Sequence, residues 1–344
     1  MIKTLNIVIV GSSGLVGKEI INLLNKQYIK YNKLKLISNT SCGNEVIVND
    51  KAYKVEKYVD NSFLFYNVIF LCVDKELSKF YAYEALKNAC KVIDASTYFR
   101  MKTIVPLVVP EVNGYVLNLN NKNYNIISNP NCCTILLTMI LYPIKKLSKI
   151  KSVTVSTYQS ASGAGYKGLE ELKSQCKVYN ENNDINITET NELISVFGRQ
   201  YIWNIFSHNS EIDLESKYND EELKIINETK KILGDKHIDI SATCIRVPTL
   251  RSHCETISLV LENSVKKETI IEALNNFNGI RVIDDYKNNK FPEAVDSAEQ
   301  HDVLVGRIRN RYGDKTNTKY ELFISGDQIL KGCALNMLQI CKLL

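Results

Sequence analysis

The sequence lacks the features of several large protein classes. Its 43 Lys and Arg residues face 38 Asp and Glu residues, which leaves a net charge of only +5, and the lysines are spread along the chain. A nucleic-acid-binding protein would gather its basic residues in a stripe or patch. No apolar run has the length of a signal peptide or a membrane span. We therefore expect a cytoplasmic protein that binds neither nucleic acid nor membrane.

The ten cysteines contain no Cys-x-x-Cys pair, and no metal site is predicted. A chain of this length without a secretion signal is expected to keep its thiols reduced, most of them as buried packing residues. Repeats, long linkers and low-complexity tracts are also missing. What remains is a globular chain of 344 residues with 45% hydrophobic content, enough for about two domains.

Apolar runs alternate with helical patterns in the first third of the chain, which predicts a doubly wound parallel sheet of the Rossmann type. The runs are residues 6–10, 34–38, 67–73, 91–96 and 125–128. Later strands alternate more strictly and predict an α+β domain with a mixed sheet. We expect a dinucleotide-binding domain over 1–130, completed by a C-terminal helix at 326–344, and a second domain over 131–325.

Three glycines, Gly11, Gly14 and Gly17, follow the first predicted strand and open a helix. At such a turn the backbone can approach a pyrophosphate, which the unpaired N–H groups of the helix start bind. An Asp or Glu at the end of the second strand would bind the ribose of NAD, but the residues there are Ser38, Asn39, Thr40 and Ser41. This absence favours NADP.

Cys132 follows Asn129-Pro130-Asn131 at the start of an apolar helix, where the helix end lowers the pKa of a thiol and provides a nucleophile. His253 is one of only four histidines and shares its segment with Arg246 and Arg251, side chains that suit carboxylate or phosphate binding. A thiolate paired with an imidazole is suited to covalent catalysis on an acyl group.

Seven blocks of the sequence, in order, resemble the aspartate-semialdehyde dehydrogenase family. They are PLVVPEVN (106–113), NPNCCTI (129–135), STYQSASGAGYKGLEEL (156–172), EELKIINETKKIL (221–233), CIRVPTLRSHCET (244–256), HDVLVGRIR (301–309) and GDQILKGCALNMLQI (326–340). The resemblance implies a thioester on Cys132, with the second domain used for catalysis and dimerisation.

The resemblance also implies roles for single residues. Catalysis falls to Cys132, to His253 as acid/base and to Gln159, which orients the substrate or a bound water. Substrate binding falls to Arg100, Asn113, Glu222 (amino group), Lys224 (phosphate, with Arg100) and Arg246 (carboxylate). The cofactor contacts are Gly11, Ser13, Gly14, Leu15, Val16, Ser38, Thr40, Ser41, Ser162, Gly163 and Asn336.

The implied reaction is the reversible, NADPH-dependent conversion of 4-aspartyl phosphate to aspartate 4-semialdehyde and phosphate. It belongs to lysine, threonine, methionine and diaminopimelate biosynthesis, and family members form homodimers or homotetramers. Thr40 stands where many relatives have an Arg, so NAD stays an alternative cofactor, and Leu71-Cys72-Val73-Asp74 replaces a usual Ser-Ala-Gly segment. Two other functions remain open: an N-acetyl-γ-glutamyl-phosphate reductase and a non-catalytic dinucleotide-binding regulatory subunit.

Overall fold

The computed structural model describes residues 5–121, 124–182 and 191–344, which fall into two compact units. Unit 1 comprises Met1–Cys132 with Gly332–Leu344, and unit 2 comprises Cys133–Lys331. Each unit is built on a seven-stranded sheet. Within the described ranges, no helix combines the length and the hydropathy needed to cross a membrane.

The sheet of unit 1 has the strand order β3-β4-β2-β1-β5-β6-β7. Its strands are β1 (Leu5–Val10), β2 (Tyr31–Ile37), β3 (Glu45–Val48), β4 (Lys51–Glu56), β5 (Val68–Leu71), β6 (Lys91–Asp94) and β7 (Ile126–Ser128). All neighbouring strands are parallel except β3 and β4. The predicted doubly wound sheet is confirmed.

The β3–β4 hairpin is an addition that the apolar runs did not predict. Its turn residues, Asn49 and Asp50, both have positive φ angles, of 49° and 60°. Asn and Asp tolerate this backbone region better than other side chains, and two-residue hairpins of this type require it at both positions. The strands themselves alternate exposed and partly buried residues, so they carry no continuous apolar signal.

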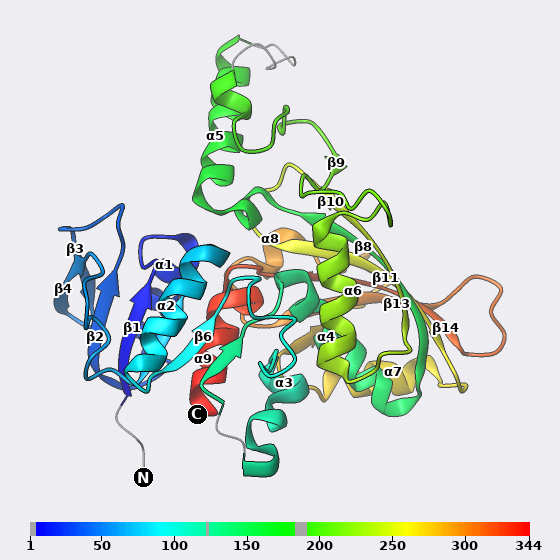
Figure 1. The fold of residues 1–344 in the computed structure, drawn as a ribbon. Helices are drawn as coiled ribbons and strands as arrows, with labels where there is room; N and C mark the ends of the chain where they lie inside the picture. Colours follow the sequence, from blue (N-terminus) through cyan, green and yellow to red (C-terminus); the bar gives the residue numbers. More distant parts are fainter. Residues whose placement is uncertain (1–4, 122–123, 183–190) are drawn as a thin grey trace. The chain divides into compact units, whose positions relative to one another are not determined.

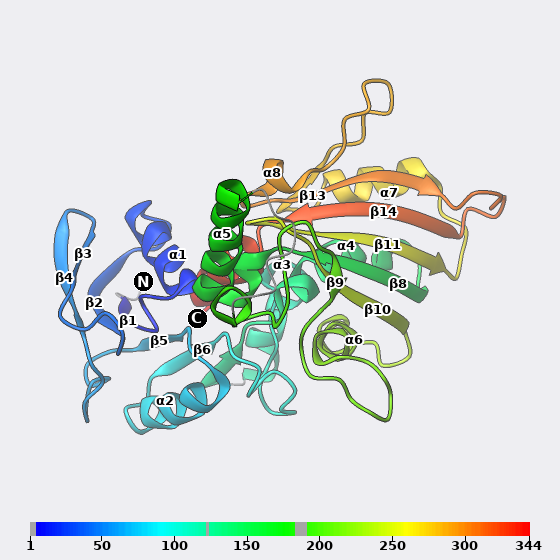
Figure 2. The ribbon, with the colours of Figure 1, turned by 90° about the horizontal axis from the view of Figure 1, so that it is seen from above.

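Helices cover both faces of the first sheet. They are α1 (Leu15–Asn25), α2 (Lys75–Lys87), α3 (Pro110–Asn113), η1 (Gly114–Asn121) and α9 (Leu335–Lys342). Figure 2 shows α1 and α2 on opposite sides of the central strands. The C-terminal helix α9 contacts α1, α3 and β6, so the end of the chain completes the unit with which the chain begins.

The sheet of unit 2 has the order β12-β13-β14-β11-β8-β10-β9. Its strands are β8 (Ile150–Gln159), β9 (Phe206–Ser207), β10 (Asp239–Arg246), β11 (His253–Leu261), β12 (Ile280–Val282), β13 (Val303–Asn310) and β14 (Lys319–Gly326). Two pairs, β8/β10 and β12/β13, are parallel, and the others are antiparallel. The predicted mixed sheet is confirmed.

One face of this second sheet is covered and the other is open. The helical segments are α4 (Cys132–Leu147), η2 (Ala161–Ala164), α5 (Gly165–Asn182), η3 (Asn191–Ile194), α6 (Asp220–Leu233), α7 (Lys267–Asn275), α8 (Ala294–Ser297) and the π-helical η4 (Leu330–Ala334). Figure 1 shows α6 in front of the strands and α7 below them. Buried residues alternate with more exposed ones along β8, β10 and β11, as expected for strands covered on one side.

Candidate active site

The register of three adjacent strands brings Gln159, Arg246 and His253 to one edge of the second sheet. Arg246 pairs with Gln159 across the parallel strands β10 and β8. Cys254 pairs with Tyr158 across β11 and β8, so His253 lies beside Gln159. All three side chains are on the covered face, with exposed fractions of 0% for Gln159, 5% for Arg246 and 1% for His253. Residues separated by 94 positions in the sequence thus meet at one place.

The backbone fixes the tautomer of His253. The N–H of Ser160 donates a hydrogen bond to Nδ1 of His253 over 3.1 Å, and the Ser160 hydroxyl lies 3.2 Å from the same atom. Because a backbone N–H can only donate, Nδ1 must accept, and the proton of the neutral ring is on Nε2. His253 therefore presents a hydrogen-bond donor to its surroundings.

Gly163 packs against this imidazole and against Arg246. A Cβ atom at Gly163 would lie 3.0 Å from both Cε1 and Nε2 of His253 and 3.2 Å from Nη1 of Arg246. The guanidinium is held by the carbonyl of Ser160, which accepts from Nη1 over 3.3 Å, and by Asn209 Oδ1, which accepts from Nε over 3.4 Å. A glycine at this position leaves room for both side chains.

Gln159 connects the start of α4 to the start of α6. Its Nε2 donates to Sγ of Cys133 over 2.9 Å and to Oε1 of Glu221 over 3.1 Å. Its Oε1 is buried without a hydrogen-bond partner among the described residues, so this oxygen is available to a ligand. Cys132, the half-buried first residue of α4, precedes the fully buried Cys133.

Two neighbouring carboxylates, Glu221 and Glu222, make different contacts. Glu222 completes a capping box at the start of α6, in which it accepts from the N–H of Asn219 over 2.9 Å. It also accepts from the N–H of Cys244 over 3.0 Å. Glu221 instead contacts Gln159. The predicted contact of Glu222 with a substrate amino group stays a prediction, and the second carboxylate, Glu221, was not among the predicted site residues. The Asn-x-x-Glu spacing of residues 219–222 is the sequence signal of this capping box.

The predicted phosphate ligand Lys224 lies one helical turn from Glu221. Its Nζ is 3.5 Å from Glu221 Oε2 and 3.2 Å from Asp220 Oδ2. Both partners come from the first turn of α6, where negative side chains are favoured by the helix dipole. The ammonium group is thus held near the site while its side chain remains 23% exposed.

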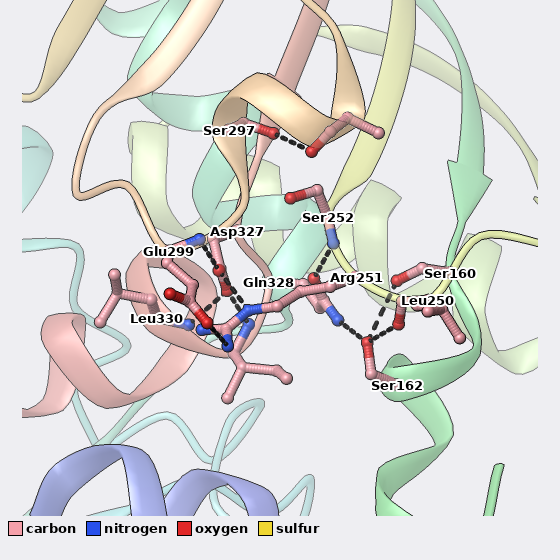
Figure 3. Close-up of polar contacts among 12 residues, drawn as sticks. Ser160, Ser162, Leu250, Arg251, Ser252, Ser297, Glu299, Asp327, Gln328 and Leu330 are labelled. Atoms are coloured by element: carbon pink, nitrogen blue, oxygen red, sulfur yellow. Dashed lines mark hydrogen bonds and ion pairs between the residues drawn. The ribbon is translucent and has the colours of Figure 1, made fainter. Parts of the chain in front are cut away.

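Arg251, the second arginine of the His253 segment, belongs to a structural network. Its Nε forms an ion pair with the buried Asp327 at 2.5 Å, and Asp327 also accepts from the N–H groups of Glu299, Ile329 and Leu330. Figure 3 shows this cluster beside a second chain of contacts. There, Gln328 accepts from the N–H of Ser252 and donates to the hydroxyl of Ser162. This network anchors the loop that leads into His253.

Two residues predicted to contact the cofactor, Ser162 and Gly163, lie in this part of unit 2. The Ser162 hydroxyl donates to the carbonyl of Leu250 over 2.5 Å and accepts from Gln328. Gly163 lies against His253, as described above. Their proposed contact with a cofactor stays a prediction.

In unit 1, the glycine turn has the shape that the sequence predicts. Gly11 has a φ of +83°, and a Cβ there would lie 2.3 Å from the Cys72 carbonyl oxygen. A Cβ at Gly17 would lie 2.4 Å from the Gly11 carbonyl oxygen. At Gly14 the only close atom would be the Gly11 oxygen at 3.4 Å, so its other side is open. Leu15 and Val16 begin α1 directly after this opening.

Hydroxyl groups gather where β2 ends. Ser13 Oγ lies 2.6 Å from Ser38 Oγ and 3.0 Å from Thr40 Oγ1. A neighbouring cavity of about 440 Å³ is lined by residues that include Ser13, Ser41 and Lys18. Ser41 Oγ is buried and has no hydrogen-bond partner among the described residues. Lys18 reaches this cavity from α1 and not from the residues after the second strand.

Asn336 and Asn113 occupy different kinds of position in unit 1. The Nδ2 of Asn336 donates to the Val108 carbonyl over 3.0 Å and to Asn129 Oδ1 over 2.8 Å, while its Oδ1 is buried without a partner in the described structure. Asn113 uses its Oδ1 and Nδ2 on the backbone of Val109 and Leu107, both at 2.9 Å. Asn336 therefore has an acceptor available, and Asn113 chiefly holds its own loop.

Two thiols of unit 1, Cys72 and Cys333, have a raised pKa. Burial raises the pKa of Cys333 to about 12, and the charges of Arg100 and Cys132 also act on that thiol. Burial raises the pKa of Cys72 well above its usual value, and Cys333 adds to the effect. Arg100 and Cys132 are therefore each close enough to Cys333 to act on its thiol. Protonated thiols are poor nucleophiles, so neither Cys72 nor Cys333 suits the role predicted for Cys132.

The segment that departs from the family pattern has a local role. The side chain of Asp74 accepts hydrogen bonds from the N–H groups of Glu76 and Leu77, both at 3.0 Å, and so caps α2. Asp is among the preferred residues at this position because its carboxylate satisfies free N–H groups and opposes the helix dipole.

Known proteins share both units of this chain. The family model described as "Semialdehyde dehydrogenase, NAD binding domain" matches residues 6–119, and "Semialdehyde dehydrogenase, dimerisation domain" matches residues 141–331. Aspartate-semialdehyde dehydrogenase of Prochlorococcus marinus is 37% identical, over 99% of this chain and 96% of the relative. The Helicobacter pylori enzyme is also 37% identical, over 98% and 97%. The chain belongs to the aspartate-semialdehyde dehydrogenase family.

Solved structures of the family agree with this assignment. Aspartate semialdehyde dehydrogenase II from Vibrio cholerae superimposes with a TM-score of 0.90 at 32% identity, covering 99% of this chain and 98% of that one. The same Vibrio protein has also been solved "complexed with ASA". The match therefore spans both units of this chain.

Proposed function

We propose that this protein catalyses the reversible reductive dephosphorylation of 4-aspartyl phosphate to aspartate 4-semialdehyde. The observation that carries the proposal is the meeting of Gln159, Arg246 and His253 at one sheet edge, with His253 held as an Nε2–H donor. Arg246 would bind the substrate carboxylate by a charge-assisted contact. Glu221, rather than the capping residue Glu222, would bind the substrate ammonium group. Lys224 and Arg100 would bind the phosphoryl group.

In the proposed mechanism, the Cys132 thiolate attacks the acyl carbon, a C–S bond forms, and the C–O bond to phosphate breaks as inorganic phosphate leaves. A reduced nicotinamide, when bound, supplies a hydride to the resulting thioester. His253 donates a hydrogen bond from Nε2 to the substrate oxygen while that oxygen carries negative charge. The aldehyde carbonyl then re-forms and the Cys132 thiolate leaves. Gln159 keeps the start of α4 fixed through Cys133 during these steps.

The residues of unit 1 fit a dinucleotide. The open side of Gly14 at the start of α1 suits a pyrophosphate, and the unpartnered Oδ1 of Asn336 suits an amide donor such as a carboxamide. We favour NADP over NAD, because the end of β2 offers hydroxyl groups instead of a carboxylate and Lys18 shares a cavity with Ser41. Lys18 would supply the positive charge that Thr40 does not.

We propose that the protein forms a homodimer through the open face of the second sheet, with a tetramer as a larger alternative. A cavity of about 450 Å³ on this face is lined by charged and apolar side chains of several strands, among them Arg309, Glu321 and Phe323. The matching family model is itself described as a dimerisation domain. Molar mass in solution, measured by light scattering, tests this part of the proposal.

A steady-state assay tests the function directly. The enzyme should oxidise aspartate semialdehyde only when phosphate and a nicotinamide cofactor are both present. NADP should give a higher kcat/KM than NAD, and Lys18→Gln should weaken NADP binding about tenfold, measured by fluorescence titration, while NAD binding stays unchanged. Preference for the N-acetylglutamyl substrate would support the rival reductase, and cofactor binding without turnover of either substrate would support a regulatory subunit.

A further inference from the structure

One histidine at the edge of the site, His208, has no role in the mechanism above. It follows the short strand β9, in which Phe206 pairs with Arg246 and Ser207 pairs with Ile245. The N–H of His208 donates to the Cys244 carbonyl over 2.8 Å, which continues this pairing by one residue. Because side chains alternate along a strand, His208 shares the face of Arg246 rather than that of Ile245.

The hydrogen bonds of His208 define which ring nitrogen carries a proton. The N–H of Ser210 donates to Nδ1 of His208 over 3.2 Å, and the Ser210 hydroxyl lies 3.0 Å from the same atom. Nδ1 must accept, so the proton of the neutral ring is on Nε2. This is the arrangement that Ser160 imposes on His253. Within the described part of the chain, Nε2 of His208 has no protein acceptor.

The surroundings of His208 are those of the substrate site. Burial lowers the pKa of its imidazole to about 4, and the charges of Arg246, Glu221, Lys224 and His253 act on it in that order. These groups come from β10, α6 and β11, so His208 faces the site from a fourth element. The half-buried ring stays neutral at physiological pH and offers one N–H donor beside the Arg246 guanidinium.

We propose that His208 is a substrate-binding residue whose Nε2–H donates to the substrate carboxylate held by Arg246. The inference rests on the proposed function. A carboxylate has two oxygen atoms and several acceptor positions, so contact with the Arg246 guanidinium leaves acceptor positions for a second donor. A neutral donor adds specificity without adding charge. Ser210 connects this donor to the start of α6, because the N–H of Glu221 donates to the Ser210 hydroxyl over 3.2 Å.

Two substitutions separate binding from folding. His208→Asn keeps an acceptor close to the position of Nδ1, and so keeps the Ser210 contact, but it withdraws the Nε2 donor. His208→Gln places an amide N–H near Nε2. We expect His208→Asn to raise KM for aspartate semialdehyde about 10- to 100-fold, the loss of one hydrogen bond to a charged group, with kcat changed less than threefold. His208→Gln should restore most of the affinity. The exposed His237→Asn serves as the control.

The readouts distinguish the possible failures. KM for phosphate and the Kd for NADP should stay unchanged in both His208 variants. A rise in KM for phosphate instead, an unchanged KM in His208→Asn, or equal losses in both variants together with a lowered Tm would each overturn the inference. Titration calorimetry of aspartate semialdehyde on the Cys132→Ser background measures the same affinity without turnover. If the wild type binds the semialdehyde but does not convert it, the proposed function fails while the calorimetric comparison still decides the role of His208.

Discussion

Gly163 lies directly against His253, with no space for a side chain between them. A Cβ at Gly163 would be 3.0 Å from Nε2 of His253, closer than most Cβ contacts in proteins. Gly163→Ala should therefore displace the imidazole and lower kcat/KM for aspartate semialdehyde about 10- to 100-fold, because small misplacements of reacting groups are costly. Steady-state kinetics and a thermal melt check this. A large fall in Tm, or unchanged kinetics, would contradict the explanation.

The adjacent thiols Cys132 and Cys133 should respond differently to the same substitution. Cys132→Ser removes the nucleophile and should abolish turnover while the Kd for NADP stays the same. Cys133→Ser leaves a hydroxyl that can still accept from Nε2 of Gln159, so activity should remain within about tenfold of the wild type. Turnover assays on the two variants, prepared in parallel, measure the difference. Retained turnover in Cys132→Ser would eliminate the thioester.

The two carboxylates at the start of α6 should divide into a binding role and a folding role. Glu221→Gln should raise KM for the semialdehyde at least tenfold with little change in Tm, because the ammonium partner is lost. Glu222→Ala should instead lower the free energy of unfolding by about 1–2 kcal/mol through loss of the capping box. Kinetics and urea unfolding on both variants check the assignment. The reverse pattern would return the amino group to Glu222.

Arg251 pairs with two carboxylates, Asp327 and Glu299, and their removal should have unequal effects on stability. Asp327 is fully buried and accepts four hydrogen bonds, so Asp327→Ala should lower the free energy of unfolding by about 3–5 kcal/mol. Glu299, whose side chain is 76% exposed, is the matched control, and Glu299→Ala should cost less than about 1 kcal/mol. Urea unfolding compares them. Similar losses of unfolding free energy in both variants would show that burial does not decide how much each carboxylate contributes to stability.

His208 should make the protein sensitive to acid. Burial lowers its pKa to about 4 in the folded protein, against about 6.5 when unfolded. Between these values the unfolded chain binds more protons, so the free energy of unfolding falls as the pH drops through that window. From pH 7.5 to pH 5 the contribution of this group is about 2 kcal/mol. His208→Gln should lose less stability than the wild type over this range in urea unfolding, whereas equal losses would contradict the shift.

Local chemistry made much of the protein predictable. The apolar runs predicted the first sheet, because strands buried on both faces need continuous hydrophobic residues. The glycine turn and the Asn-Pro-Asn entry to α4 could also be predicted, because neighbouring residues alone set those backbone conformations. The β3–β4 hairpin was not predicted, because its strands are half exposed and contain no continuous apolar run. The position of Lys18 near the end of β2 was not predicted, because α1 and the end of β2 meet only in the folded chain.

The sequence by itself determined which groups are available: one thiol at a helix start, a histidine between two arginines, and hydroxyl groups where a carboxylate would select NAD. The tertiary structure decided which of them act together. Strand register placed Gln159, Arg246 and His253 at one edge, the buried Asp327 engaged Arg251, and the capping box engaged Glu222, leaving Glu221 at Gln159. The register and the Arg251–Asp327 ion pair join residues far apart in the chain, and sequence spacing carries no information on such contacts. The capping box is local, so only this contact could be read from the spacing of Asn219 and Glu222.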